Sequence, residues 1–181
     1  MTDTAYRIRD AQPTLADAQA LTDALLDCVE GGASVSLMWP LPRAKALAFW
    51  QNALASAERG ERIVLIAEEA AQTGSTSTAV VGTVQVVLDL PENQPHRGDV
   101  AKMLVHRRAR RHGLGAQLMR AAEDSAREAG RTLLVLDTVT GGDAERLYAR
   151  LGWQRVGVIP GYALWPHGGL CDTTVFYRTL A

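Results

Sequence analysis

A basic turn with two glycines leads into a helix in the middle of the chain, and its residue types suit phosphate binding. The turn covers residues 110–115, includes Gly113 and Gly115, and follows the apolar run 103–105. Glycine lets backbone N–H groups approach a ligand closely, and the first turn of a helix leaves its N–H groups without intrahelical partners. The helix dipole and nearby arginines add positive potential. We therefore expect a phosphate-bearing group to bind here, although a tight strand-to-helix connection would also need such glycines.

The turn does not match the common nucleotide-binding patterns. Leu118 stands where the dinucleotide fingerprint G-x-G-x-x-G requires its third glycine, and no Gly-Lys-Ser/Thr follows. The pattern that is present is Arg110-x-x-Gly113-x-Gly115, followed by a long helix. This segment resembles the acetyl-CoA pyrophosphate loop of the GNAT N-acetyltransferase superfamily, which has the form Arg/Gln-x-x-Gly-x-Gly/Ala.

A second segment, residues 144–153, resembles the GNAT pattern Ala-x-x-Leu-Tyr-x-x-Leu-Gly-Phe/Trp. Its apolar residues have helical spacing, and Gly152 suits the end of that helix. On its own, Tyr148 could be an ordinary half-buried tyrosine. The resemblance instead implies that Tyr148 points at the cofactor sulfur and protonates the departing CoA thiolate. One departure is Gly141, where many relatives carry an asparagine.

The resemblance also implies which residues bind acetyl-CoA. Backbone groups at the strand end would hold the pantetheine arm, and N–H groups of the turn would hold the pyrophosphate. Arg110 would support the loop, and Arg107 or Arg108 would reach the ribose phosphate. An exposed loop position is the alternative for His112, and no metal site is expected. The cofactor-binding residues expected are Met103, Leu104, Val105, Arg110, Arg111, His112, Gly113, Leu114, Gly115 and Ala116.

Two carboxylates are candidates for the general base that acetyl transfer to an amine requires. A lysine-like amine has a pKa of about 10, so the acceptor must lose a proton before it attacks. Asp99 lies near the start of the strand that leads to Val105, where relatives often carry Glu. Asp137 ends the apolar run 133–136, and ligands often gather at such strand ends. Each could instead be a turn or capping residue, or could bind the ammonium of the substrate.

The composition is that of an ordinary globular protein. Hydrophobic residues make up 47% of the 181 residues and charged residues 22%, and the net charge is -1. These values predict one domain over residues 1–181 and no nucleic-acid partner. No apolar run reaches the roughly 20 residues of a membrane span, and residues 1–6 lack the features of a signal peptide, which predicts a cytoplasmic protein. Cys28 and Cys171 are expected to be buried thiols.

Hydrophobic periodicity predicts the element order β-α-α-β-β-β-α-β-α-β-β, an α/β protein with a mixed sheet and helices on both faces. This is also the order of a single GNAT domain, so the resemblance covers essentially the whole chain. Loops or turns are expected at 34–40, 72–78 and 91–96. The expected strands are 6–9, 62–68, 79–88, 98–105, 133–136, one from Gly152 and 173–178; the expected helices are 13–30, 42–59, one from Gly113 to Gly130, and 144–151.

The segment 156–174 resembles the tabtoxin-resistance acetyltransferases, a bacterial subgroup that inactivates a small amine-bearing β-lactam toxin, and residues 136–141 fit that subgroup too. Tyr162 and Trp165 in this segment could line an acceptor pocket or anchor a loop. The sequence therefore predicts an acetyl-CoA-dependent N-acetyltransferase, a monomer or homodimer, that acts by direct attack of a small-molecule primary amine. The acceptor could be a toxin or antibiotic such as tabtoxinine-β-lactam. A protein or peptide N-acetyltransferase, a non-catalytic acyl-CoA-binding sensor and a nucleotide-binding module are the alternatives.

Overall fold

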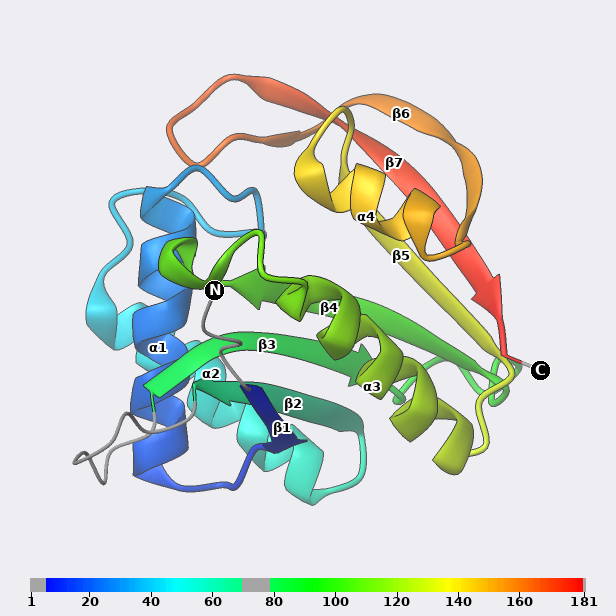
Figure 1. Cartoon of the computed structure of the whole chain (residues 1–181), viewed down its shortest axis with the longest axis horizontal. Helices are drawn as coiled ribbons and strands as arrows, with labels where there is room; N and C mark the ends of the chain where they lie inside the picture. Colours follow the sequence, from blue (N-terminus) through cyan, green and yellow to red (C-terminus); the bar gives the residue numbers. More distant parts are fainter. Residues whose placement is uncertain (1–5, 70–78, 181) are drawn as a thin grey trace.

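The computed structural model describes residues 6–69 and 79–180, so the turn expected at 72–78 lies outside the described residues. Within these ranges, seven strands form one mixed sheet in the order β1-β2-β3-β4-β5-β7-β6, and four α-helices flank it (Figure 1). This confirms the predicted element order. The strands are β1 (Tyr6–Asp10), β2 (Arg62–Glu69), β3 (Ala79–Val87), β4 (Arg97–Val105), β5 (Leu133–Val139), β6 (Gln154–Leu164) and β7 (Leu170–Thr179); the helices are α1 (Leu15–Glu30), α2 (Arg43–Glu58), α3 (Leu114–Glu128) and α4 (Asp143–Arg150).

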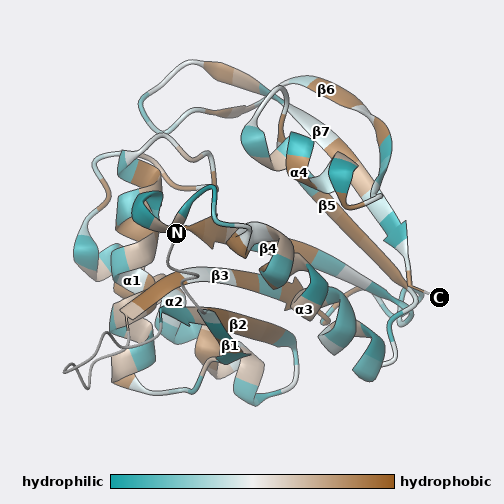
Figure 2. Ribbon diagram, viewed as in Figure 1, coloured by the Kyte–Doolittle hydropathy of each residue, from teal (hydrophilic) through white to brown (hydrophobic). Residues whose placement is uncertain are grey.

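The helices cover both faces of the sheet, and each face has its own buried core. Figure 2 shows mainly hydrophobic central strands and hydrophilic residues along the outer side of α3. Burial of these apolar faces is the main force that holds the layers together. Among the described residues, no helix has the length and apolar character needed to cross a membrane. One core, beside α3 and α4, includes Leu118, Leu136, Tyr148 and Phe176; the other, beside α1 and α2, includes Leu21, Trp50, Ile66 and Leu104.

The strand β4 separates from β5 partway along its length. The two strands run parallel, but they pair only where residues 97–99 meet residues 133–135. Beyond Asp99 they diverge, as Figure 1 shows. In the second half of β4, no described strand pairs with the edge that faces β5, so this edge is open to a ligand that can hydrogen bond as a strand does.

A β-bulge lies in the same half of β4. Leu104 pairs with Thr83, but Ala101 pairs with Gln85, so Lys102 and Met103 together oppose a single residue of β3. Lys102 has a positive φ of 50°, which is uncommon for a residue with a side chain. The bulge changes the alternation of the strand, so the side chains after it face opposite sides from those expected for an unbroken strand.

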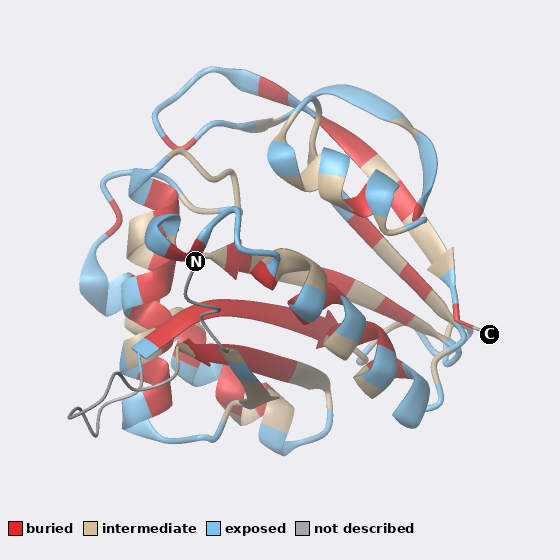
Figure 3. Cartoon of the chain, in the orientation of Figure 1, coloured by how far each residue is buried: buried red, intermediate tan, exposed pale blue. Residues whose placement is uncertain are grey.

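The C-terminal segment that contains Tyr162 and Trp165 forms a β-hairpin, and the start expected for its second strand was wrong. Strand β6 includes Tyr162 and ends at Leu164, and β7 begins at Leu170 rather than at residue 173. Pro160 is tolerated because it lies where the pairing of β6 with β7 is interrupted, and because β6 is an edge strand. Figure 3 shows that most of β6 is exposed.

Candidate active site

A pocket of about 1190 Å³ lies where β4 and β5 diverge. Segments far apart in sequence line it, including the loop after α1, the end of β4, the start of α3, α4 and the β6–β7 hairpin. Asp99 and His112 are absent from its lining. The sequence-predicted residues that line it are Met103, Leu104, Val105, Arg110, Arg111, Gly113, Leu114, Gly115, Ala116, Asp137 and Tyr148.

The glycine turn places unpaired backbone donors at the mouth of this pocket. Gly113 is the N-cap of α3 and has a φ of 77°, in the left-handed region that favours glycine. Because glycine has no side chain, no side-chain cap occupies the N–H groups of Leu114 and Gly115, whereas the Ala116 N–H donates to the Gly113 carbonyl at 3.1 Å. Arg110 steadies the turn, since its Nε donates to the Val105 carbonyl at 3.0 Å. The turn therefore has the geometry of an anion site at a helix N-terminus.

Gly115 is the point at which three elements of the site meet. A Cβ at this position would lie 3.0 Å from Leu147 Cδ2 on α4 and 3.9 Å from Met103 Sδ on β4. The first distance is shorter than an ordinary van der Waals contact. The absence of a side chain at Gly115 lets the start of α3 approach both α4 and the edge of β4. These three elements therefore lie close together around the pocket.

Arg107 and Arg108 form ion pairs with carboxylates outside the pocket. Arg107 Nε contacts Asp27 at 2.8 Å, and its terminal nitrogen contacts Glu30 at 2.6 Å. Arg108 lies 3.3 Å from Glu69. Neither arginine lines the pocket. Their guanidinium groups are occupied by carboxylates, so the expected contact with a ribose phosphate has no support in this arrangement.

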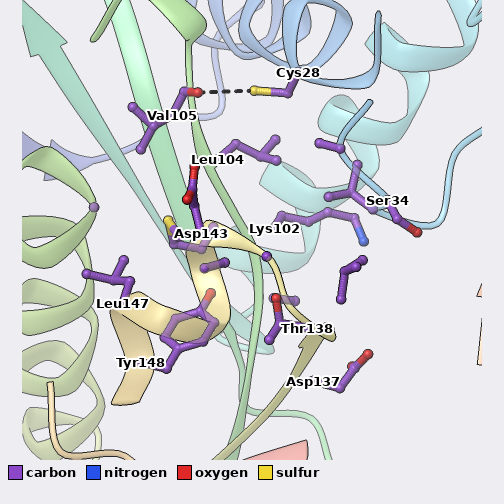
Figure 4. Close-up of a pocket in the computed structure, with 18 of the residues that line it drawn as sticks. Cys28, Ser34, Lys102, Leu104, Val105, Asp137, Thr138, Asp143, Leu147 and Tyr148 are labelled. Atoms are coloured by element: carbon purple, nitrogen blue, oxygen red, sulfur yellow. Dashed lines mark hydrogen bonds between the residues drawn. The ribbon is translucent and has the colours of Figure 1, made fainter. Parts of the chain in front are cut away.

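Tyr148 combines a buried ring with a hydroxyl that faces the pocket. The residue is 5% exposed, and its ring lies 6.0 Å from the rings of both Trp153 and Phe176. Within residues 6–69 and 79–180, the hydroxyl has no hydrogen-bond partner, and it points into the pocket in Figure 4. Burial, followed by the charge of Asp137, raises the pKa of Tyr148. The hydroxyl therefore keeps its proton near neutral pH and can donate it.

Of the two candidate carboxylates, the structure brings only Asp137 to the pocket. Asp137 lies near the end of β5, and its Oδ2 accepts a hydrogen bond of 2.9 Å from Thr173 Oγ1. Asp99 lies at the other end of β4, where the strand still pairs with β5, and it forms an ion pair with Arg97. Asp99 therefore lies apart from the other candidate site residues, and its carboxylate is paired with Arg97.

Lys102 is a pocket residue that the sequence interpretation missed. Its side chain extends past the ring of Phe49 on α2, with Nζ 5.6 Å from the ring centroid, and it lines the pocket. Burial lowers the pKa of Lys102, and the charge of Asp137 opposes this effect. The available signal was a single charged residue inside the otherwise apolar run 100–105. Among the described residues, no three His, Cys, Asp or Glu side chains are grouped as a metal site would require.

The segment around Gly141 is held by internal hydrogen bonds. The backbone N–H of Gly141 donates to the Glu145 carboxylate, and the hydroxyls of Thr140 and Thr174 lie 2.8 Å apart. Thr138 lines the pocket, whereas Thr140 does not. Gly141 occupies the position where many GNAT proteins carry an asparagine. Of the two threonines before it, only Thr138 is in place to contact a ligand.

Comparison with known proteins identifies the family. The model of the Acetyltransferase (GNAT) family matches residues 19–153, a range that includes both the glycine turn and α4. The chain belongs to the GNAT acetyltransferase family.

Solved structures of similar proteins share the fold over nearly the whole chain. A GCN5-related N-acetyltransferase from Kribbella flavida is 23% identical with a TM-score of 0.77, and the match covers 97% of this chain and 98% of that one. The yncA protein of Salmonella typhimurium, solved with its cofactor acetyl-CoA, is 23% identical with a TM-score of 0.74 and coverages of 98% and 95%. A ribosomal-protein-alanine N-acetyltransferase from Brucella melitensis is 24% identical with a TM-score of 0.75 and coverages of 96% and 99%. The mixed sheet and its helices therefore form a GNAT domain.

Proposed function

We propose that this acetyltransferase moves the acetyl group of acetyl-CoA to the primary amine of a small molecule by direct attack. The observation that carries the proposal is the convergence of three groups on one pocket. These groups are the uncapped N-terminus of α3, the unpaired edge of β4 and the Tyr148 hydroxyl. The first two suit a ligand with phosphates and amides, and the third is a proton donor.

The chain's own groups fit acetyl-CoA in two places. The N–H groups between Arg111 and Ala116 would hold the pyrophosphate, with Gly113 and Gly115 allowing close approach. Backbone groups of residues 103–105 would hold the pantetheine arm along the open edge of β4. When bound, acetyl-CoA supplies a thioester whose carbonyl carbon is open to attack by an amine.

Asp137 and Tyr148 have complementary roles in proton transfer. Asp137 would take a proton from the acceptor ammonium, directly or through water, and Thr173 holds the carboxylate in place. Tyr148 would give its proton to the departing sulfur, because its hydroxyl stays protonated and faces the pocket. Asp99 has no part in this scheme, since it pairs with Arg97 outside the pocket.

Direct attack is favoured over a route through acetylated Cys28. Cys28 lines the pocket, but its Sγ donates to the Val105 carbonyl at 3.5 Å. Burial raises the pKa of the Cys28 thiol. The thiolate is the nucleophilic form of cysteine, so a thiol held in this way is a poor acyl acceptor.

A small acceptor is favoured by contacts that close one side of the pocket. Ser34 Oγ, in the loop after α1, donates to the Leu164 carbonyl at 3.0 Å, and Trp39 N donates to the Pro166 carbonyl at 2.9 Å. These hydrogen bonds join the loop to the β6–β7 hairpin. Because both segments line the pocket, their contact bounds the space that an extended peptide would have to cross.

The test is a measurement of CoA release from acetyl-CoA in the presence of different acceptors. The panel contains small primary amines, including tabtoxinine-β-lactam, and peptides with free N-termini. We expect release with one or more small amines and little with peptides. Preferential release with peptides would replace this proposal with a protein N-acetyltransferase. Tight binding of CoA without amine-dependent release would indicate a non-catalytic sensor.

A further inference from the structure

We infer that Lys102 forms an anion subsite for the acceptor, so that the acceptor is a small zwitterion whose carboxylate binds Lys102 while its amine faces Asp137. The inference rests on the proposed function for the fate of the amine. The anion site itself depends only on the position and surroundings of Lys102.

The bulge in β4 directs Lys102 to the side of the sheet that bears α1 and α2. Val100 belongs to the core beside α3, whereas Leu104 belongs to the core beside α1 and α2. Residues four apart on an unbroken strand share one face, so the strand reverses its facing at the bulge. The contact of Lys102 with Phe49 on α2 is consistent with this reversal.

The Lys102 ammonium lacks a counter-ion in the part of the chain that the structure describes. Among the described residues, no carboxylate oxygen lies within 4.0 Å of Nζ and Nζ donates no hydrogen bond, so Asp137 acts on it only from a longer distance. The aromatic face of Phe49 is attractive to a cation but does not neutralise it. A partly buried cation without a partner is costly, and an anionic group of a ligand would offset that cost.

Of the pocket carboxylates, Asp137 is the one assigned to the other charge of the ligand, because it lies on the same side of the pocket as Lys102 in Figure 4 and its charge acts on Lys102. Three carboxylates line the pocket within the described residues. Asp143 forms an ion pair with Arg146 on α4, and Asp172 accepts a hydrogen bond of 2.8 Å from the Gly161 N–H. Asp137 lies near enough to influence the charge of Lys102, yet not near enough to pair with it.

The two charges occupy one region of the pocket. In Figure 4, the Lys102 ammonium and the Asp137 carboxylate lie toward the same side as Ser34, away from Leu147 and Tyr148. A cation and an anion that remain apart complement a molecule carrying the opposite charges on a short frame. An amino acid or a close analogue has this arrangement, whereas a simple alkylamine lacks the anionic group.

The first experiment uses the fact that the chain contains only two lysines, Lys45 and Lys102. Protein carrying ¹³Cε-labelled lysine gives two NMR signals, which the variant Lys45→Arg assigns. Sodium n-butyrate is titrated at constant ionic strength, with butyramide as the uncharged control. We expect the Lys102 signal to shift and saturate with butyrate alone, while that of the exposed Lys45 moves little. A Lys102 signal that moves no more than that of Lys45 would overturn the anion subsite.

The second experiment compares acceptors that differ only in their charge. The CoA-release assay is run with a panel of α-, β- and γ-amino acids, each paired with its carboxamide. For Lys102→Met, we expect the ratio of kcat/KM for acid over amide to fall roughly 10- to 100-fold, as for the loss of one charge-assisted contact. Lys102→Arg should recover part of the ratio.

The two experiments separate the two proposals. An unchanged ratio in Lys102→Met would refute the role of Lys102 in specificity, even if overall activity fell. If no amine in the panel causes CoA release while butyrate still shifts the Lys102 signal, the anion subsite stands and the proposed transfer reaction fails.

Discussion

The two ends of the pocket present different kinds of binding group. At the proposed donor end, the binding groups are backbone N–H and C=O groups of a nearly continuous stretch, residues 103–116. At the proposed acceptor end, they are single side chains from separate strands, namely Lys102 on β4 and Asp137 on β5. Substitutions should therefore affect donor binding through backbone conformation, and acceptor recognition through charge and hydrogen bonding.

Tyr148 lines the same pocket, and the largest effect is expected there. In Tyr148→Phe, the ring packing with Trp153 and Phe176 is retained while the proton donor is lost. We expect kcat to fall by roughly 10³-fold, within the usual range for general acid catalysis, with little change in CoA affinity. Steady-state kinetics and a CoA titration measure the two quantities. An unchanged kcat would remove Tyr148 from the proposed mechanism.

The pH profile of the wild-type enzyme gives an independent check on Tyr148. Burial and the charge of Asp137 raise the pKa of Tyr148 above the ordinary value of 10.0 for tyrosine. The protonated form is the active one in the proposed role, so its loss should limit kcat only above about pH 10. A decline in kcat beginning near neutral pH in the wild-type enzyme, but absent in a Tyr148→Phe variant with residual activity, would contradict this assignment.

Asp137 and Asp99 form a matched pair for testing the acceptor end. In Asp137→Asn, the side chain can still accept the hydrogen bond from Thr173 but cannot act as a base. We expect kcat/KM for the amine to fall roughly 10²-fold. Asp99→Asn is the control, because its ion pair with Arg97 lies outside the pocket; it should change activity less than about twofold and cost under about 1 kcal/mol of stability. Equal losses in the two variants would break the distinction between them.

The donor end should respond to conformation instead of charge, and Gly113→Ala tests this. A Cβ at Gly113 would meet nothing within 4 Å, so the expected effect comes from its φ of 77°. We expect a loss of about 1 kcal/mol in the free energy of unfolding and a rise of about tenfold in the Kd for CoA. Denaturant unfolding and CoA titration measure these changes.

Gly130→Ala is the control for this variant. Gly130 follows α3 at its other end, has a φ of 75°, and also has open space around a Cβ. It should lose similar stability without any change in CoA affinity. A Kd that rises equally in both variants would show that general destabilisation, and not the geometry of the glycine turn, controls CoA binding.

The same contrast explains which parts of the site could be predicted from the sequence. The glycine turn is local, because Gly113 and Gly115 lie within the segment that they shape, so their spacing predicts their geometry. The roles of Asp99 and Arg107 depend instead on their partners. Arg107 is held by Asp27, which is 80 residues away in sequence, and no spacing rule reveals that contact.

Lys102 illustrates the other limit on prediction. Its orientation depends on a bulge that exists only when β3 and β4 pair with a shifted register. Period-two alternation assigns faces only to a regular strand, so it gives the wrong facing after an irregularity. The overall element order was predictable because each helix and strand carries its own periodicity, whereas the β6–β7 hairpin was obscured by Pro160 and Gly161.

The smallest expected effect concerns Asp27, which supports the donor end from outside the glycine turn. Its carboxylate accepts 2.8 Å hydrogen bonds from the backbone N–H and the Nε of Arg107. Burial alone would raise the pKa of Asp27, but these contacts outweigh it and hold that pKa below the ordinary value of 3.8. At a pH between the two pKa values, the folded state therefore binds fewer protons than the unfolded state. The contribution of Asp27 to stability is present above its pKa in the unfolded state and is lost as the pH falls through its pKa in the folded state.

In Asp27→Asn, we expect the free energy of unfolding to fall by about 1 kcal/mol near pH 7, with the difference from the wild type shrinking toward about pH 3. CoA affinity should change less than about threefold, since Arg107 does not line the pocket. The control is Asp23→Asn. Asp23 lies on the same helix as Asp27 and forms an exposed ion pair with Arg43 on α2, so its loss should change stability little at either pH. A large loss of CoA affinity in Asp27→Asn would mean that side-chain contacts outside the turn also determine donor binding. The donor end would then depend on side chains as the acceptor end does, and the distinction between the two ends would no longer hold.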